Sequence, residues 1–207
     1  MEKEIYVRKK EIGCVILAAG KSVRFGKNKL TEPLGGVPVL ARTLSALPKE
    51  TFTRICAVVS SDGAEEIARR AEVPFVRYAG GPLSQSIRMG LEAMKGLDGC
   101  MFLNGDQPLI RTESIRRLLD AFSAHSDAVY RLSFGGVQAS PAVFPAALFD
   151  ALLDLKGEQG GMAAARNTNA AVCPVEAEGE EELWDMDTAD CLERAAAFLA
   201  QNAGQRR

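Results

Sequence analysis

Three unbroken apolar runs, each followed by a helical pattern, place the tightest constraint on how this chain can fold. The runs are six residues long and contain almost no polar side chain: Gly13–Ala18, Ile55–Ser60 and Gly99–Asn104. A strand that is apolar on both faces is typical of a parallel sheet that helices cover on both sides. We therefore predict an α/β fold with a mostly parallel sheet and helices on both faces.

The rest of the chain continues this alternation. Apolar residues at helical spacing predict helices over residues 37–47, 63–71, 84–95, 112–125, 145–155 and 188–200. Strands are expected at 75–78, 127–133, 142–144 and 170–175, with a hairpin turn at Gly135-Gly136. Thr112 and Thr188 are expected to cap their helices. No repeat or long linker divides the chain, so we expect one domain over residues 1–207.

Composition excludes several classes of protein. With 207 residues, 47% of them hydrophobic, the chain can bury a sizeable core without disulfides or a metal. No apolar run approaches the roughly 20 residues that a membrane span needs. The charged N-terminus, Met1–Glu4, lacks the pattern of a secretory signal. We therefore expect a cytoplasmic protein without a membrane partner, and the net charge of −2 argues against a nucleic-acid partner.

Cysteine and histidine usage excludes several kinds of site. The five cysteines lie far apart without a C-x-x-C pair, which argues against a zinc site and a disulfide framework. The single histidine, His125, rules out a metal site built from several histidines. Because His125 ends a helical pattern and precedes Ser126 and Asp127, we expect it at an exposed helix end.

A cationic, glycine-containing loop follows the first apolar run. Between positions 21 and 29 it holds four basic residues and no acid, and Gly20 and Gly26 flank most of it. Small residues let backbone N–H groups approach an anion, so the loop is a candidate phosphate site. It is not a Walker A loop, because five residues separate the glycines and Asn28 stands where Ser or Thr would bind Mg²⁺. A solvated surface loop is the alternative.

Two carboxylates are candidate metal ligands. Asp106 follows the most apolar strand, where an acidic side chain is costly unless it binds a cation or hydrogen-bond donors. Opposite a phosphate loop it is a natural Mg²⁺ ligand, the alternative being an aspartate that caps a turn. Asp187 directly precedes Thr188 and is a candidate second ligand. Its alternative is a solvated acidic loop, because residues 176–187 contain seven of the 27 acidic residues.

Several motifs together resemble one family. The loop L-A-A-G-x-S-x-R-F-G-x-x-K at residues 17–29 resembles the signature loop of the MobA-like nucleotidyltransferases. Residues 80–91 are similar to the family's G-x-S-x-S-(I/L)-x-x-G-L segment, and Gly105–Pro108 to its G-D-Q-P motif. The S-P-x-x-F-P segment at 140–145, the turn at 157–160 and the D-x-D-T signature at 185–188 complete the resemblance.

The resemblance implies a fold and a reaction. The fold would be the Rossmann-like GT-A nucleotidyltransferase fold, with a small hairpin-containing insert on the acceptor side. An acceptor phosphate would attack the α-phosphorus of a nucleoside triphosphate, and pyrophosphate would leave. Such chemistry needs positioning and charge neutralisation, here with Mg²⁺ as cofactor, more than a histidine base.

The same resemblance assigns roles to individual residues. Residues expected to act in catalysis are Arg24, Lys29 and Asp106. Residues expected to bind substrate are Leu17, Ala18, Ala19, Gly20, Ser22, Gly80, Ser84, Ser86 and Gly105. The expected metal ligands are Asp106 and Asp187, with Asp185 as the alternative to Asp187.

The subtype follows from one loop residue and from the acceptor side. Ala19 makes the loop L-A-A-G, whereas guanylyl-transferring members resemble L-A-G-G. The chain is most similar to the MocA-like molybdenum cofactor cytidylyltransferases, which join CTP to the terminal phosphate of molybdopterin. A transient contact with a molybdoenzyme or its chaperone would follow. Two positions depart from that pattern: Ser140 replaces Asn or His before Pro141, and Met162 replaces an Arg.

Two alternatives therefore stay open. One is a related nucleotidyltransferase that acts on another phosphorylated acceptor, such as a sugar phosphate or an alcohol phosphate. The other is a nucleotide-binding regulator without activity, although the presence of Arg24, Lys29, Asp106 and Asp187 together argues against it.

Overall fold

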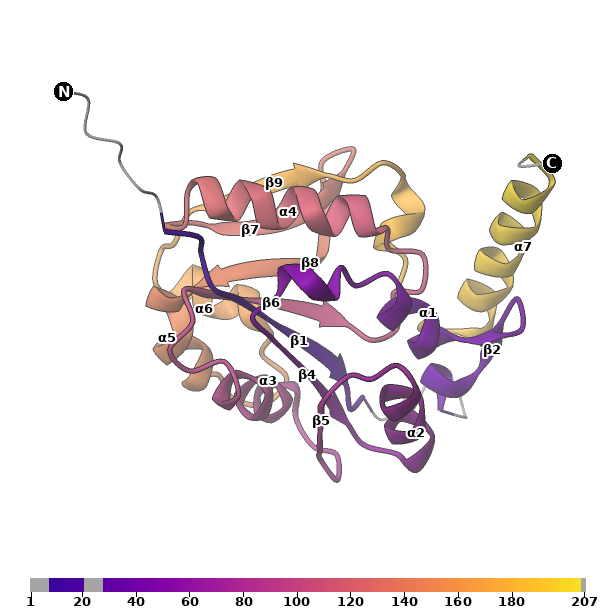
Figure 1. Cartoon of the computed structure of the whole chain (residues 1–207), viewed down its shortest axis with the longest axis horizontal. Helices are drawn as coiled ribbons and strands as arrows, with labels where there is room; N and C mark the ends of the chain where they lie inside the picture. Colours follow the sequence, from indigo (N-terminus) through magenta and orange to yellow (C-terminus); the bar gives the residue numbers. More distant parts are fainter. Residues whose placement is uncertain (1–7, 21–27, 206–207) are drawn as a thin grey trace.

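The computed structural model describes residues 8–205, except for 21–27, so the predicted site residues Ser22 and Arg24 lie outside the described residues. Within this part of the chain, a seven-stranded sheet has the order β5-β4-β1-β6-β8-β7-β9 (Figure 1). The strands are β1 (Ile12–Ala18), β4 (Arg54–Val59), β5 (Phe75–Arg77), β6 (Gly99–Asn104), β7 (Val129–Phe134), β8 (Val137–Pro145) and β9 (Val172–Glu176).

The sheet is mostly parallel. β1 lies parallel to β4 and β6, β4 to β5, and β7 to β9. β8 is antiparallel to both of its neighbours, β6 and β7. The predicted hairpin joins β7 and β8, and its turn residues Gly135 and Gly136 have φ angles of 56° and 83°. The predicted α/β class is therefore confirmed, and the hairpin strands belong to the main sheet.

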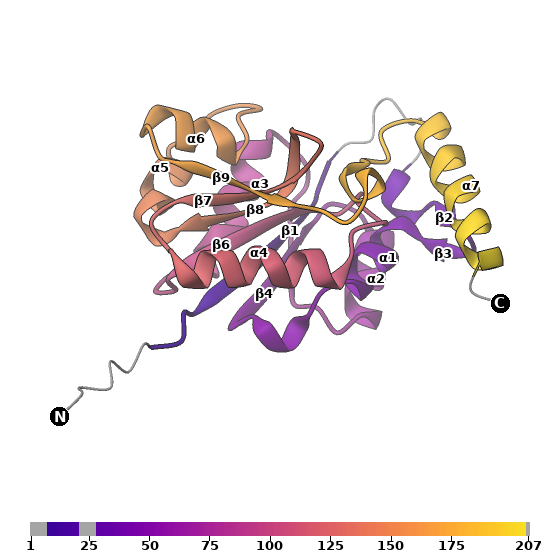
Figure 2. The ribbon, with the colours of Figure 1, turned by 90° about the horizontal axis from the view of Figure 1, so that it is seen from above.

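Helices cover both faces of this sheet (Figure 2). On one face pack α1 (Val39–Ser45), α2 (Asp62–Arg70) and α4 (Thr112–Ala124), and on the other α3 (Leu83–Glu92), α5 (Phe149–Leu153) and α6 (Gly161–Asn167). Side chains along β1 alternate between the two layers: Cys14 and Ile16 join the first apolar cluster, and Val15 joins the second. All three are fully buried, as the apolar run predicted.

A third apolar cluster lies at one end of the molecule. There α7 (Ala189–Gln205) lies beside the two-stranded ribbon of β2 (Pro33–Leu34) and β3 (Val37–Pro38) (Figures 1 and 2). The buried side chains of this third cluster include Leu34 and Met186. Short 3-10 helices complete the described chain: η1 (Lys29–Thr31), η2 (Lys49–Thr51), η3 (Ala146–Leu148) and η4 (Glu180–Leu183). None of the helices in the described residues has both the length and the apolar character that a bilayer span needs.

Some predicted helix ends were wrong. Thr112 does not cap α4, because its hydroxyl donates to the carbonyl of Ala46, 2.9 Å away, and Arg111 stands at the cap position. The helix predicted over 145–155 is divided into η3 and α5, since Pro145 still belongs to β8. The cap at Thr188 is confirmed, because its hydroxyl accepts from the backbone N–H of Cys191 at 3.2 Å. His125 is exposed at the end of α4, as predicted.

Candidate active site

A cavity of about 570 Å³ opens at the carboxyl ends of β1 and β6. The two strands are neighbours, with Leu17 opposite Asn104, while β4, the next strand of this sheet along the chain, lies on the other side of β1. Ligands of doubly wound sheets bind at such a reversal of strand order. The cavity is lined by Leu17, Ala19, Gly20, Lys29, Leu30, Gly81, Pro82, Leu83, Ser86, Asn104, Asp106 and Glu158.

A lysine between two carboxylates lies at this edge of the sheet. Lys29 begins η1, Asp106 follows β6, and Asp187 precedes α7, so distant parts of the chain meet here. The Lys29 ammonium contacts Asp106 Oδ2 and lies 2.7 Å from Asp187 Oδ1. The side chains of Lys29 and Asp106 are only 15% and 11% exposed, whereas that of Asp187 is 52% exposed. A deep ion pair thus extends outward to a third, solvent-facing group.

The environment of Lys29 favours its charged form. Burial acts to lower the pKa of its ammonium, but the charges of Asp106 and Asp187 and their hydrogen bonds outweigh it, so the pKa of Lys29 is raised. A neighbouring carboxyl, Asp185, behaves differently. Burial raises the pKa of Asp185 to about 6, and the negative charge of Asp106 adds to this, while a hydrogen bond from Asn104 at 3.4 Å opposes it. Negative charge is therefore crowded around the lysine.

This donor set fits a magnesium ion. Among the described residues, no three His, Cys, Asp or Glu side chains converge to hold a metal on their own. Mg²⁺ commonly takes only one or two carboxylates and completes its shell with substrate phosphates and water. Asp106 and Asp187 already hold one cationic group, the Lys29 ammonium, between them. The predicted ligand pair is thus close enough to share a cation.

A main-chain hydrogen bond connects the two carboxylate-bearing loops. The backbone N–H of Met186 donates to the carbonyl of Asp106 at 3.1 Å. The Met186 side chain is fully buried in the third apolar cluster, with Leu34 among its neighbours. Asp185 and Asp187 therefore flank an anchored residue beside the cavity.

The structure brings together most of the predicted site residues. Leu17, Ala19, Gly20, Lys29, Ser86 and Asp106 line the cavity, and Asp187 joins them through Lys29. Ala18, Gly80, Ser84 and Gly105 are not among its lining residues. Ala18 packs into the core beneath the opposite face, and Ser84 is only 3% exposed. The backbone N–H of Gly105 donates to the carbonyl of Leu17 at 2.9 Å, and the carbonyl of Gly105 accepts from the Thr43 hydroxyl at 3.0 Å.

Six of the lining residues were not among the predicted site residues, and two of these six, Asn104 and Glu158, carry polar side chains. Asn104 ends a buried strand. Glu158 lies in a turn, and its carboxylate accepts a hydrogen bond from the backbone N–H of Leu83 at 3.4 Å. Glu158 stands in the 157–160 turn that carries part of the family resemblance, which was the available signal. Asn104 gave none beyond its position at the strand end.

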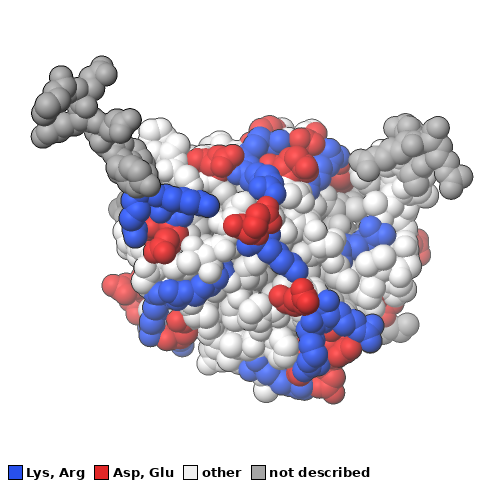
Figure 3. Space-filling model, viewed as in Figure 1, with Lys and Arg blue, Asp and Glu red and all other residues white. Residues whose placement is uncertain are grey.

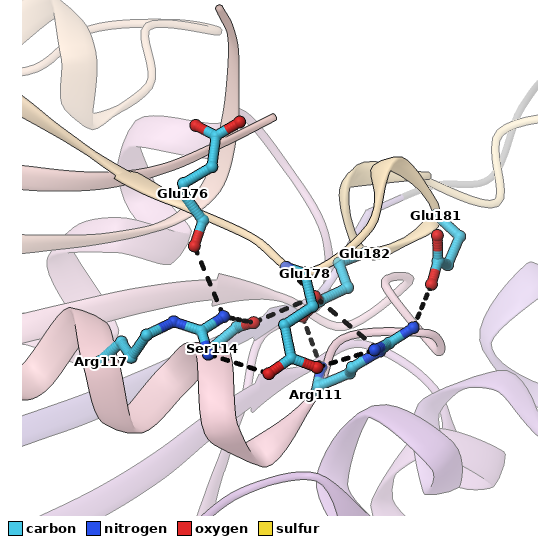
Figure 4. A network of polar contacts seen from close by, with 7 residues as sticks. All are labelled: Arg111, Ser114, Arg117, Glu176, Glu178, Glu181 and Glu182. Carbon is cyan, nitrogen blue, oxygen red and sulfur yellow. Dashed lines mark hydrogen bonds and ion pairs between the residues drawn. The ribbon is translucent and has the colours of Figure 1, made fainter. Parts of the chain in front are cut away.

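The acidic segment before Asp187 is fixed to the protein, and this excludes a purely solvated loop. Glu182 is fully buried and accepts hydrogen bonds from the backbone N–H of Arg111 at 3.0 Å and the Ser114 hydroxyl at 3.0 Å (Figure 4). Glu178 contacts Arg111 at 2.8 Å and Arg117 at 3.0 Å. The start of α4 thus holds the segment that leads into Asp185 and Asp187.

A second cavity, of about 420 Å³, adjoins the first. It shares Leu17, Leu83 and Asn104 with the first cavity, and it extends over β8 toward α6. Ser140 and Met162, the two positions that depart from the cytidylyltransferase pattern, both line it. The cavities are therefore contiguous, and the sequence departures are confined to the second.

Charged side chains on the outer surface are mixed in sign. Basic and acidic groups lie side by side on the face seen in Figure 3. Many of them form ion pairs, such as Arg8 with Asp98 at 2.6 Å and Arg77 with Asp62 at 2.6 Å.

The fold and this edge define a class of protein. A mostly parallel sheet with a cavity at its switch point, lined by carboxylates and a lysine, is typical of doubly wound α/β proteins that bind phosphorylated ligands. The chain belongs to the MobA-like NTP transferase family, whose domain model matches residues 14–172. The predicted family is therefore confirmed, and the chain is a member of a nucleotidyltransferase family.

Curated relatives cover different shares of the chain. The purine catabolism protein PucB of Bacillus subtilis is 28% identical over 84% of this chain and 90% of its own length. The 2-C-methyl-D-erythritol 4-phosphate cytidylyltransferase of Dehalococcoides mccartyi is 33% identical over 58% of this chain and 56% of its own. The bifunctional protein GlmU of Rhodospirillum rubrum is 35% identical over 58% of this chain. The chain spans about a quarter of the GlmU proteins that it matches.

Solved structures share the fold over almost the whole chain. A nucleotidyl transferase from Methanothermobacter has a TM-score of 0.79 at 22% identity, covering 93% of this chain and 99% of its own. Rv0371c of Mycobacterium tuberculosis, in a complex with manganese, has a TM-score of 0.73 at 22% identity, covering 92% and 100%. The predicted Rossmann-like nucleotidyltransferase fold is therefore confirmed.

Proposed function

We propose that this protein is a Mg²⁺-dependent cytidylyltransferase that transfers CMP from CTP to the terminal phosphate of molybdopterin and releases pyrophosphate. The observation that carries the proposal is the Lys29 ammonium between Asp106 and Asp187, beside a cavity that Ala19 and Gly20 also line. A partly buried cation beside two carboxylates suits a ligand that brings both phosphate charge and a metal ion.

The residues of this edge would act by position and charge. The backbone at Ala19 and Gly20, together with Lys29 and the predicted Arg24, would hold the triphosphate of CTP. An oxygen of the acceptor phosphate attacks the α-phosphorus, the bond to the β-phosphate oxygen breaks, and pyrophosphate leaves. Lys29 would neutralise charge that accumulates on the leaving group. Asp106 and Asp187 would hold Mg²⁺, which supplies further neutralisation of the phosphate oxygens.

Two observations support CTP as the donor. Ala19 lines the cavity and is only 4% exposed, so its methyl group narrows the space that a larger purine base would need. A relative 33% identical to this chain over 58% of it is named a cytidylyltransferase. Its name also specifies an alcohol phosphate as acceptor.

A second candidate differs only in the acceptor. Ser140 and Met162, which depart from the molybdopterin-specific pattern, both line the second cavity. This placement favours an acceptor other than molybdopterin, such as an alcohol phosphate or a sugar phosphate. The donor chemistry would be the same in both cases.

A pyrophosphate-release panel tests the proposal. Each of the four nucleoside triphosphates is incubated with the protein and Mg²⁺, with molybdopterin, with a sugar phosphate or alcohol phosphate, or without acceptor. We expect release to require CTP and molybdopterin together and to stop with EDTA. Release with another acceptor supports the second candidate. A preference for GTP contradicts cytidylyl transfer, and no release under any condition contradicts the proposed activity.

A further inference from the structure

The second cavity combines an apolar interior with a cationic edge. Its interior includes the rings of Phe102 on β6 and Phe144 on β8, which pack edge to face with centroids 5.8 Å apart. Ile87 of α3 adds an aliphatic wall. The charged residues of the lining are two arginines, Arg131 and Arg166, and one carboxylate, Asp185. A ligand that fills this space would therefore have an apolar body and a negatively charged group.

The strand register places Arg131 on the same face as this interior. Arg131 of β7 is opposite Ala142 of β8, which in turn is opposite Phe102 of β6. Cross-strand neighbours point to the same side of a sheet, so Arg131 projects toward the layer of α3 and α6. Two strand spacings separate Arg131 from Phe102, on the order of 10 Å. Its Nε donates to the carbonyl of Ala139 at 3.1 Å, which turns the guanidinium toward the hairpin end of β8.

That end of β8 lies at the edge of the sheet where the first cavity opens. The antiparallel register of β6 and β8 brings Ser140 level with Asn104, and the Ser140 hydroxyl accepts from the Asn104 backbone N–H at 3.1 Å. Arg131 is therefore held at the same end of the sheet as Asn104, where the two cavities meet. Arg166, near the end of α6, faces the cavity from the helix layer.

The two arginines have no counter-ion in the described part of the chain. Neither guanidinium forms an ion pair with a described carboxylate. Among the described residues that line the cavity, Asp185 alone carries a carboxyl group, and its charged neighbours are Asp106, Asp187 and Lys29. Burial lowers the pKa of Arg131, and the positive charge of Arg166 lowers it further. Two like charges face one cavity, which an anion would stabilise.

We propose that Arg131 and Arg166 bind the phosphate of the acceptor at the mouth of the second cavity, with the acceptor's apolar body against Phe102 and Phe144. Two guanidinium groups suit an oxyanion, because each presents parallel N–H donors. This inference rests on the proposed function, because it assigns the residues that position the acceptor in that reaction. It also restricts the acceptor to phosphate esters whose body is at least partly apolar.

Binding of a simple probe tests the inference directly. The full chain is first saturated with the α,β-methylene analogue of CTP and Mg²⁺, so that the first cavity is filled, and is then titrated with phenyl phosphate by calorimetry. We expect phenyl phosphate to bind, and inorganic phosphate to bind at least fivefold more weakly because it lacks the ring. Arg131→Gln and Arg166→Gln should each weaken phenyl phosphate at least tenfold.

Controls separate this inference from the proposed function. Arg116→Gln removes the same charge from the exposed face of α4, where Arg116 pairs with Glu50, and should leave the affinity for phenyl phosphate unchanged. Arg166 is exposed, so its variant keeps the test valid if Arg131→Gln fails to fold.

Binding of the CTP analogue is measured in each sample and should not change. Equal affinity for phenyl phosphate in wild type and both variants, or no binding to wild type, overturns the inference even where the nucleotide binds. If both variants lose affinity for phenyl phosphate while neither the wild type nor the variants bind the CTP analogue, the inference is supported and the proposed function is contradicted.

Discussion

The two adjoining cavities balance positive charge in opposite ways. In the first, Lys29 is held between Asp106 and Asp187, so its charge is matched by side chains of the protein. In the second, Arg131 and Arg166 face the cavity without a carboxylate partner among the described residues. The first arrangement is complete as it stands and must exchange partners when a ligand arrives. The second is completed only by a ligand.

The difference follows from what each cavity is proposed to bind. A triphosphate with Mg²⁺ brings both signs of charge, so carboxylates and a lysine can serve it together. A phosphate ester brings only negative charge, and a carboxylate paired with Arg131 or Arg166 would compete with it for the guanidinium groups. Variants that alter one cavity should therefore leave the other intact, and the following predictions use this separation.

The largest effect is expected for Asp106→Asn. Removing a buried carboxylate that would hold Mg²⁺ should lower turnover by roughly 10²- to 10³-fold, because charge stabilisation at the reacting phosphates is lost. Turnover is measured by pyrophosphate release, and folding by the melting temperature. Asp120→Asn, at an exposed position of α4, is the matched control. Phenyl phosphate binding should not change, and near-normal turnover would remove Asp106 from the mechanism.

Lys29→Ala should have the next largest effect. Loss of the ammonium should lower kcat/KM for the nucleotide by roughly thirtyfold, or about 2 kcal/mol of transition-state stabilisation. Arg24→Ala should act in the same direction. Lys95→Ala, at an exposed pair with Glu92, should have no effect. A change in stability alone, with unchanged kinetics, would show that the loop serves only the fold.

Glu182→Gln should loosen the segment that leads into Asp187. The buried carboxylate accepts hydrogen bonds from Arg111 and Ser114, and an amide can replace only part of this set. We expect a loss of about 1–2 kcal/mol in the free energy of unfolding, measured by urea denaturation. Glu180→Gln removes an exposed pair with Arg194 and should cost much less. Equal effects of the two substitutions would contradict the role of Glu182 as an anchor.

The smallest effect is expected for the choice of base. With Mg²⁺, CTP should raise the melting temperature more than GTP at equal concentration, because a ligand stabilises the native state according to its affinity. Ala19→Gly should narrow the difference in binding free energy between CTP and GTP by less than about 1 kcal/mol, since one methyl group is removed from the cavity wall. The two melting temperatures should become correspondingly closer. An unchanged difference between CTP and GTP in the variant would place the selectivity elsewhere.

Sequence reasoning was most reliable where burial determines the pattern. β1 and β6 were predicted almost to the residue, because strands buried on both faces leave unbroken apolar runs. The helix α6 was missed, since its seven residues are too few for a helical period to stand out. Pro145 was assigned to a helix although it ends β8, because proline is common at the first turn of a helix.

The candidate site divides in the same way. Lys29, Asp106 and Asp187 were predicted as site residues because each lies within a motif beside a strand or helix end, and the structure brings the three side chains together. Arg131 and Arg166 could not be found, since their proximity depends on the register of β7 against β8 and on the position of α6. Glu182 is one acid among many in its segment, and only tertiary contact distinguishes it. Local patterns thus predicted residues of the proposed donor site, whereas the proposed acceptor site depends on long-range strand pairing.

The hydrogen bond between the Met186 N–H and the Asp106 carbonyl has a consequence for divergence among relatives. Because it joins main chain to main chain, it can form with any residue at position 106 and with any residue except proline at position 186. Substitutions around both loops, including the exchange of Met186 for another apolar residue, should therefore leave the spacing of Asp106 and Asp187 unchanged. Evolution can thus vary the pocket walls, and with them the substrate, without rebuilding the pair of acids at its mouth.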